Sequence, residues 1–524
     1  MPHIQPPLPN VFSGRLLTEG MPTVADNYAA ARLIADMSVD DLGGVPITAP
    51  SEGANELIAR QMAAEAEFSL LRTDVRTASD WYTGAIARMM AVAGIMHPEI
   101  VSDEAAASHP CGLFADAQDA RTALIAAIAI TSQNNTVNEN LAYGLEQYRA
   151  LCATGRFAPT RYGANGSAIE HNLARFNMML EGCGGRLSTV HRVLTMKVKM
   201  SDLKALASLH GIEVTAGKEL ADEMVFGSMI FGPKIGNGFM QNLLGNLNDS
   251  ITIDMWLMRT FGRYTGTLIR DEVRGDAFER LIRGLRRTER NASAVAAMKE
   301  AGVWRSISEL RDLDNLDLLE HCRALKRHWE GLRRRYVEGR IGDTLQPRLR
   351  AGPRRSNQET SEFKAKLGWP GAVESITKSL GGTVDVPGSA RLRRWIRTVV
   401  RRALEILDDA GYSMSAADLQ AILWYPEKEI YGRLTGRPFE RLNSSYDEIM
   451  AKVARKEGFS DDEIERALRS VGDERGGRPG MGRGPVQSDS DPVEGVLLGF
   501  GAPVRTVDDE GFDDEPGYAR AAGF

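Results

Sequence analysis

The chain has 524 residues, enough for two to four domains at roughly 100–200 residues each. Its formal net charge is −6 and 43% of its residues are hydrophobic, which excludes a uniformly basic DNA-coating protein and fits ordinary soluble cores. The N-terminus, MPHIQPPLPN, has no apolar signal core, and the longest apolar run, near 123–130, is too short to span a bilayer. We therefore expect no membrane partner and a cytoplasmic location.

Four cysteines are scattered along the chain: Cys111, Cys152, Cys183 and Cys322. No pair has the spacing of metal ligands in zinc sites or iron–sulfur clusters, so the sequence predicts no metal site. Scattered cysteines are typical of proteins from a reducing compartment, in agreement with a cytoplasmic location.

The sequence of the first half of the chain predicts a poorly ordered N-terminal segment followed by helices. Residues 1–50 combine Pro, Gly and short apolar patches, which favours a poorly ordered N-terminal segment. Apolar periodicity then predicts helices at 55–71, 80–93, 116–130, 137–154, 168–180, 201–210, 218–230 and 239–247, and one more that begins at Asp254. The helix at 116–130 is so apolar that we expect it in a core. Residues 51–345 are predicted as one mainly α domain.

The second half predicts a linker at 346–361, a smaller helical unit at 362–471 and a disordered, low-complexity acidic tail at 472–524. Within the helical unit, 391–402 carries six arginines beside an apolar stripe, which suits either a DNA backbone contact or a solvated helix face. Trp424 and Tyr425 precede Lys428. Aromatic rings beside a lysine can stack on unpaired bases, although such spacing is more typical of a core.

The segment 231–259, FGPKIGNGFMQNLLGNLNDSITIDMWLMR, carries the main functional pattern. Gly232 and Gly236 punctuate a tight turn that contains Lys234, and Asp254 opens a later helix. Glycines permit positive φ and a close approach of the backbone to a phosphate, whose oxygens then accept from N–H groups at a helix start. The pattern predicts a contact with the DNA backbone. A helical connector without function and an aspartate that serves only as an N-cap are the simpler alternatives.

These residues resemble the helix-hairpin-helix DNA glycosylase superfamily over about residues 115–265. That family has an apolar-Pro-Gly-apolar-Gly hairpin, a helix, and a Val-Asp-x-His-x-x-Arg segment with the essential aspartate. On this resemblance Gly232 matches the hairpin glycine, Asp254 the aspartate and Arg259 the nearby arginine. It implies DNA-backbone contacts by Gly232, Lys234, Gly236 and Arg259.

A second motif lies upstream in the expected order. Residues 130–135, Ile-Thr-Ser-Gln-Asn-Asn, follow an apolar helix where the family has a Leu-Ser-Gln-Gln-Thr type segment around the extruded base. The resemblance therefore implies a base pocket that includes Gln133, Asn134 and Trp256, with Asp254 as the catalytic residue. Polar residues that merely cap a helix are the alternative for Gln133 and Asn134.

The departures from the family pattern bear on the reaction. Trp256 replaces the family's histidine, and Lys234 lies between the two hairpin glycines. The position of the lysine nucleophile in strand-cleaving glycosylases falls near Gly236, so we expect no Schiff-base lysine and no lyase chemistry. The cluster cysteines that follow the aspartate in some members are absent from the sequence.

Two reactions are compatible with the resemblance. A DNA glycosylase would use Asp254 to stabilise positive charge on the deoxyribose and to position water. A phage branch similar to glycosylases, the alpha-glutamyl/putrescinyl thymine pyrophosphorylases or amino acid:DNA transferases, instead replaces the (pyro)phosphate on phosphorylated 5-hydroxymethyluracil with an amine. The length of the chain, Trp256, and the missing lysine and cluster favour this second branch.

The second branch implies thymine hypermodification that protects phage DNA from restriction, in the host cytoplasm. Its partners would be double-stranded DNA with a modified thymine and an amine donor such as an amino acid or putrescine. It implies no cofactor, apart from magnesium on a pyrophosphate leaving group. A non-enzymatic helix-hairpin-helix DNA-binding protein and a purely structural helical protein are further alternatives.

Overall fold

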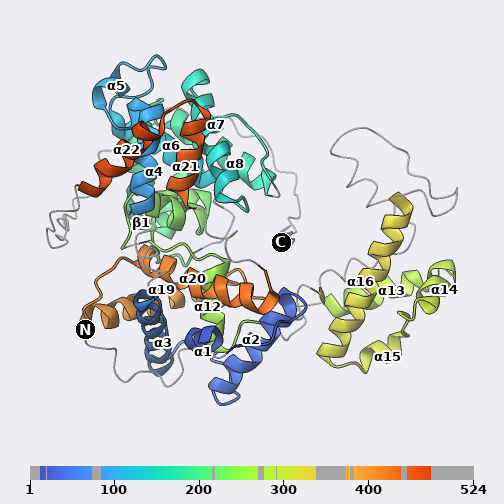
Figure 1. The fold of residues 1–524 in the computed structure, drawn as a ribbon. Coiled ribbons are helices and arrows are strands. Elements are labelled where there is room, and N and C mark those ends of the chain that lie inside the picture. The colour runs from blue at the N-terminus through green and yellow to red at the C-terminus, as the bar shows by residue number, and fades with distance from the viewer. Residues whose placement is uncertain are drawn as a thin grey trace.

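A computed structural model of the chain describes residues 12–18, 20–72, 84–163, 165–214, 219–248, 250–269, 277–290, 292–337, 383–437 and 445–473, together with Val373, Ile376 and Thr377. These residues are mainly helical, as the sequence predicts, and form two lobes and an outer unit (Figure 1). In the described ranges no helix combines the length and the apolar character needed to cross a membrane.

Lobe I is formed by the middle of the chain and two helices from near its C-terminal end. Its helices are α4 (Ile86–Met96), η3 (Pro98–Ile100), α5 (Asp103–Ala107), α6 (Ala117–Thr131), α7 (Val137–Thr154), α8 (Gly166–Gly182), α9 (Leu187–Thr195), α10 (Met200–Leu209), α21 (Tyr446–Lys456) and α22 (Asp461–Asp473). Helix α6 is buried along nearly its whole length, which confirms the predicted core helix. Gly144 of α7 faces it so closely that an added Cβ would lie 2.8 Å from Ile128 Cγ1.

The last part of lobe I departs from the predicted helices. An antiparallel pair, β1 (Lys197–Lys199) and β2 (Met224–Phe226), is followed by η4 (Gly227–Phe231), the π-helical η5 (Ile235–Met240) and the short α11 (Gln241–Leu243). The predicted helix at 218–230 is therefore wrong, and the one at 239–247 is helical only as far as Leu243. An added Cβ on Gly227 would lie 1.9 Å from the Val193 carbonyl oxygen, so tight packing against α9 takes precedence over helical periodicity here.

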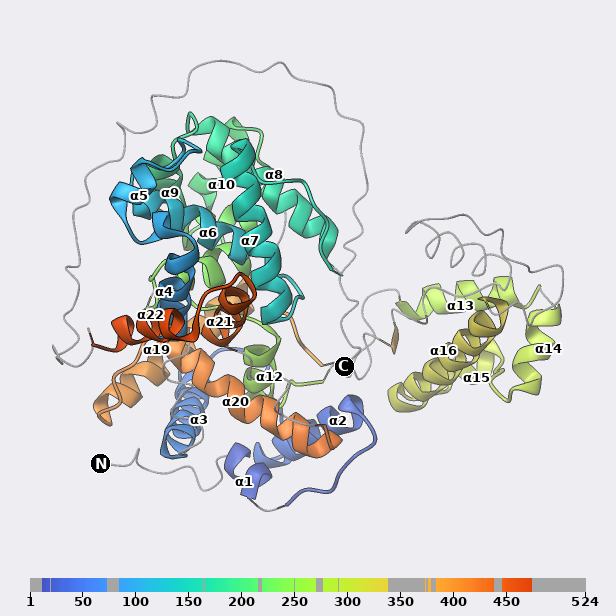
Figure 2. The same ribbon diagram turned by 45° about the horizontal axis from the view of Figure 1, so that its top comes forward.

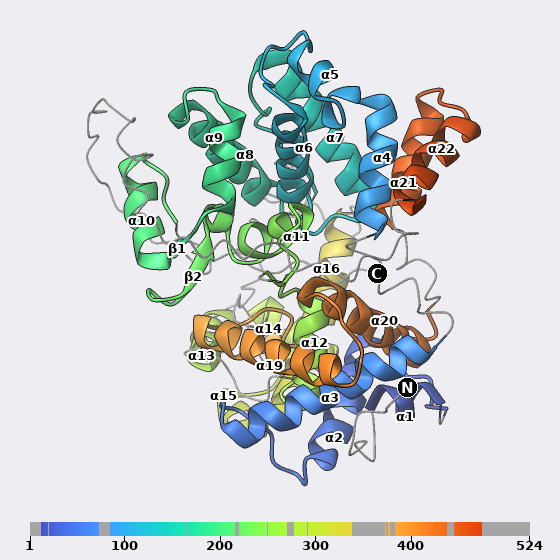
Figure 3. The ribbon, with the colours of Figure 1, turned by 90° about the vertical axis from the view of Figure 1, so that its left-hand side faces the viewer.

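Lobe II combines helices from the N-terminal part of the chain with one helix from its middle and two that precede α21. Its helices are α1 (Phe12–Thr18), α2 (Asn27–Asp41), α3 (Glu52–Leu71), α12 (Met255–Thr265), α19 (Ala390–Asp409) and α20 (Ala416–Thr435). Helix α3 packs along α19 and α20, and α12 packs against α2 and α20 (Figure 3).

This arrangement differs from the predicted domain boundaries. Helices α1 and α2 lie in the segment that the sequence predicts to be poorly ordered, and α19 and α20 belong to lobe II instead of a separate C-terminal unit. The reason is burial. The apolar stripe of α19, with Trp395 and Val399, is covered by the stripe of α3, with Ile58 and Met62.

The outer unit comprises α13 (Ala277–Thr288), α14 (Ala292–Glu300), α15 (Ile307–Arg311) and α16 (Asn315–Val337). It has its own core around Leu285 and Trp329 and stands beside the lobes (Figure 2). One contact with lobe II is made by Arg323, whose guanidinium carbon lies 3.3 Å from the ring centroid of Tyr28. The predicted single domain 51–345 is thus divided among both lobes and this unit. The predicted linker 346–361 and the tail beyond Asp473 lie outside the described residues.

Candidate active site at the start of α12

Asp254 follows the short segment by which the chain passes from lobe I to lobe II. The side chain of Gln420 clamps this segment: it accepts from the Thr252 backbone N–H at 2.8 Å and donates to the Thr252 carbonyl at 2.5 Å. Asn242 donates to the Thr252 hydroxyl at 3.1 Å. Groups from both lobes therefore fix the backbone two residues before Asp254.

Asp254 is the N-cap of α12. Its Oδ1 accepts from the backbone N–H groups of Trp256 at 3.1 Å and Leu257 at 3.0 Å. The predicted helix start is confirmed, and so is the capping role that the sequence offered as an alternative. Capping does not exclude chemistry, because both bonds go to one oxygen and leave Oδ2 outside the cap.

Asp254 is half-buried. Desolvation raises the pKa of its carboxyl, while the ammonium groups of Lys234 and Lys428, the Leu257 backbone N–H and the indole of Trp424 act in the opposite direction. A carboxyl whose pKa is raised by desolvation and opposed by named charges is a frequent feature of reactive sites.

Lys428 of α20 lies among aromatic rings, near enough to Asp254 for the two charges to act on each other. Its Nζ is 5.2 Å from the ring centroid of Trp424, 5.8 Å from that of Trp256 and 5.9 Å from that of Tyr425. Desolvation lowers its pKa to about 8, although the Asp254 carboxylate opposes this shift. The structure thus joins an acid and an amine, both largely withdrawn from water, with three aromatic rings around the amine.

The sequence singles out Trp424, Tyr425 and Lys428 but favours a core for them. Trp424 is indeed buried, whereas Tyr425 and Lys428 keep partial exposure. Trp424 and Lys428 are four residues apart and share one helix face, which is the signal present in the sequence. Nothing local places that face against the start of α12, so Lys428 was missed as a site residue.

Arg259 has a different role from the predicted DNA contact. Its Nε donates to Asp385 at 2.8 Å and one terminal nitrogen donates to Thr383 at 3.3 Å. Its guanidinium carbon lies 5.2 Å from the ring centroid of Trp256 and 4.7 Å from that of Tyr431. With an exposure of 9%, this side chain is committed to an internal ion pair and supports Trp256.

The hairpin residues divide into two groups. Gly232 has φ of +96° with open space around its Cβ position, and Lys234 is exposed, so both suit a backbone contact with DNA. Gly236 is buried, and an added Cβ would lie 1.7 Å from the Ser228 carbonyl oxygen. Gly236 therefore allows η5 to pack on η4 and does not reach a phosphate, contrary to the prediction.

Gln133 and Asn134 stand at the end of α6, which packs on η5 in lobe I. Gln133 is half-buried and donates to the Ile130 carbonyl at 3.2 Å, whereas Asn134 is exposed and has φ of 58°. Among the described residues, no hydrogen bond joins either side chain to Asp254 or Trp256. Their assignment to the base pocket stays a prediction.

The arginines of α19 form ion pairs with other parts of the chain. Arg393 and Arg397 both pair with Glu219, at 2.9 and 2.5 Å, and Arg394 pairs with Glu223 at 2.5 Å. Arg402 pairs with Glu56 of α3 at 2.8 Å. Four of the six arginines in 391–402 are therefore paired within the chain, which opposes their predicted role as an outward DNA contact.

A scan of the chain against protein-family models found no match, and neither did searches of curated proteins and of solved structures. The geometry around Asp254 and the sequence resemblance therefore carry the functional argument.

Proposed function

We propose that this protein is a DNA base hypermodification enzyme that replaces the (pyro)phosphate on phosphorylated 5-hydroxymethyluracil with an amine. The observation that carries the proposal is the set of side chains at the start of α12, where Lys428 lies near enough to act on the charge of Asp254 and Trp256, Trp424 and Tyr425 surround its amine. Enzymes that act on a base turn it out of the duplex and bind it between aromatic or apolar side chains. The choice of this reaction over other base chemistry comes from the sequence resemblance.

The acid and the amine have complementary roles in this displacement. Asp254 accepts a proton from the incoming ammonium group, which frees the nitrogen lone pair. The nitrogen forms a bond to the exocyclic carbon, and the bond from that carbon to the phosphate oxygen breaks with its electron pair. Lys428, mostly protonated near pH 7 with a pKa of about 8, stabilises the charge on the departing pyrophosphate. Arg259 is not available for this role, because its guanidinium is paired with Asp385.

The hairpin supplies the contact with DNA. Lys234 is exposed, yet its ammonium is near enough to Asp254 to act on the pKa of that carboxyl. A phosphate held by Lys234 and the turn at Gly232 would therefore lie close to the base at Asp254. Such contacts position the duplex without reading its sequence.

The test is mass spectrometry of nucleosides from treated DNA. Purified protein is incubated with DNA that contains phosphorylated 5-hydroxymethyluracil, together with glycine, other amino acids or putrescine. We expect a nucleoside heavier by the amine, with release of pyrophosphate or phosphate, and none with the Asp254→Asn variant. Unchanged nucleosides with every amine would refute the proposed reaction.

A DNA glycosylase is the second candidate. The observation in its favour is that Asp254 lies at the start of α12, where the resemblance puts the essential aspartate. The same assay separates the two, because a glycosylase yields free base and abasic sites. DNA binding without any product, unchanged in Asp254→Asn, would instead indicate a non-enzymatic DNA-binding protein.

A further inference from the structure

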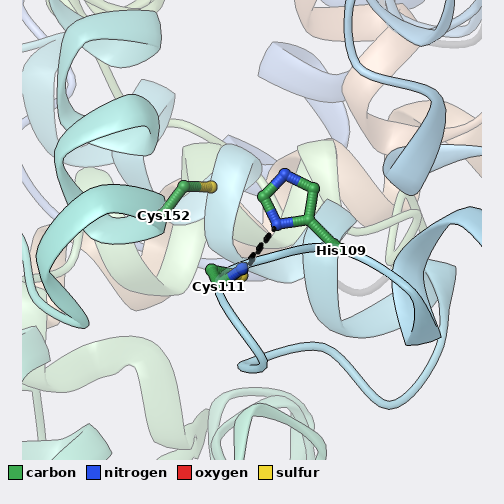
Figure 4. Close-up of side chains that lie close together, drawn as sticks. All are labelled: His109, Cys111 and Cys152. Carbon is green, nitrogen blue, oxygen red and sulfur yellow. Dashed lines mark hydrogen bonds between the residues drawn. The ribbon is translucent and has the colours of Figure 1, made fainter.

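The loop between α5 and α6 brings a histidine and a cysteine against α7. His109 and Cys111 lie on this loop and Cys152 lies on α7, with its sulfur directed towards the imidazole (Figure 4). Their three potential ligand atoms lie within 4.8 Å of one another, and all three residues are half-buried. The cysteine spacing gave no sign of this cluster, because Cys152 is distant from the other two in the sequence.

We propose that His109, Cys111 and Cys152 bind one Zn²⁺ ion through the imidazole Nδ1 and two thiolates. Zinc combines thiolate and imidazole ligands at about 2.3 and 2.0 Å, so the ligand atoms of a tetrahedral site lie roughly 3.5–3.8 Å apart. The distance from His109 Nδ1 to Cys111 Sγ is 2.9 Å, and the widest separation in the set is within 4.8 Å. Rotation of the imidazole away from the Cys111 backbone N–H, which donates to Nδ1 at 3.3 Å, would bring all three atoms to a common centre.

Glu99 faces the other side of the imidazole. Its Oε1 lies 4.0 Å from His109 Nε2, accepts from the Tyr148 hydroxyl at 2.8 Å and lies 3.2 Å from His97 Nδ1. A carboxylate that accepts from the second nitrogen of a histidine is the usual way in which proteins orient a zinc ligand, and a shift of about 1 Å would bring Glu99 within hydrogen-bond range of Nε2.

The cluster lies away from the proposed active site. In both Figure 1 and Figure 3 the α5–α6 loop is at the far end of lobe I from α12. Three protein ligands leave the fourth position to water. The ion would therefore fasten the loop at 108–116 to α7, and it has no part in the reaction at Asp254.

Cobalt substitution of the full-length protein tests the site. After chelation and reduction, titration with Co²⁺ should give a tetrahedral visible spectrum and a sulfur-to-cobalt charge-transfer band that saturates at one ion per chain and is displaced by Zn²⁺. Cys152→Ser should lose most of the charge-transfer intensity, whereas Cys183→Ser, the matched change at a cysteine outside the cluster, should keep it. Glu99→Gln should retain the band but weaken Zn²⁺ affinity about 10–100-fold.

Two results would overturn the proposal. One is the absence of a charge-transfer band in reduced protein whose helical circular dichroism is intact. The other is a band of equal intensity in the wild type and Cys152→Ser. Neither result depends on activity at Asp254.

Discussion

Lys428→Met removes a desolvated charge and should stabilise the protein while it abolishes activity. The pKa of Lys428 falls from the ordinary 10.5 to about 8, which corresponds to roughly 3 kcal/mol at about 1.4 kcal/mol per tenfold change in proton affinity. This is the cost that the folded chain bears for holding the ammonium among Trp256, Trp424 and Tyr425. Methionine has a similar length and no charge, so it avoids that cost.

The stabilisation should depend on pH with a definite sign. Below pH 8 both the folded and the unfolded chain carry this ammonium, and the folded state bears the whole cost. Between pH 8 and 10.5 the folded chain releases the proton first, so the wild type gains stability as the pH rises. The advantage of Lys428→Met should therefore fall from about 3 kcal/mol at pH 7 to about 1 kcal/mol at pH 10.

Urea unfolding of both proteins at pH 7, 9 and 10, followed by circular dichroism, measures this difference. Lys452→Met, a change at an exposed position of α21, is the matched control and should alter stability by less than about 0.5 kcal/mol at every pH. A variant at Lys428 that is less stable than the wild type at pH 7, or a difference that does not change with pH, would refute the reasoning. Either result would mean that desolvation of the amine costs little in the folded chain.

Four further outcomes are expected. Asp254→Asn should abolish product formation with little change in the unfolding midpoint, because asparagine caps a helix as well as aspartate does; a large loss of stability would show that the variant tests folding instead of chemistry. Gly236→Ala should prevent stable folding, since its Cβ would lie 1.7 Å from the Ser228 carbonyl oxygen, and normal thermal unfolding would contradict the packing of η5 on η4. Lys234→Gln should weaken DNA binding and reduce the salt slope by about one, as measured by fluorescence anisotropy, and an unchanged slope would remove Lys234 from the interface. Arg263 pairs at 2.7 Å with each of the buried carboxylates of Glu65 and Glu427, so Arg263→Leu should cost about 3–5 kcal/mol in denaturant unfolding, and less at pH 5 than at pH 8, because burial raises the pKa of Glu427 and protonation neutralises it; an equal cost at both pH values would contradict a buried ionic group of these three residues.

Local patterns predicted much of the helical framework. The predicted helix at 137–154 coincides with α7, and the one at 116–130 differs from α6 by one residue at each end. The predictions for these two segments are correct because caps and apolar faces are local properties, such as the capping box formed by Thr136 and Glu139. The predictions for 218–230 and for the end of 239–247 are wrong because the glycines of this region serve contacts with other parts of the chain, which periodicity does not report.

The sequence by itself determined that the protein is mainly α and that Asp254 begins a helix, since helix propensity, periodicity and capping act over a few residues. Only the tertiary structure decided which groups surround that carboxyl. It brought Lys428 to Asp254 and withdrew Arg259 into an ion pair with Asp385, and it gathered Cys111 and Cys152 around His109. The reason is that burial and charge pairing depend on helices far apart in the sequence, whose apolar faces meet only when the whole chain folds.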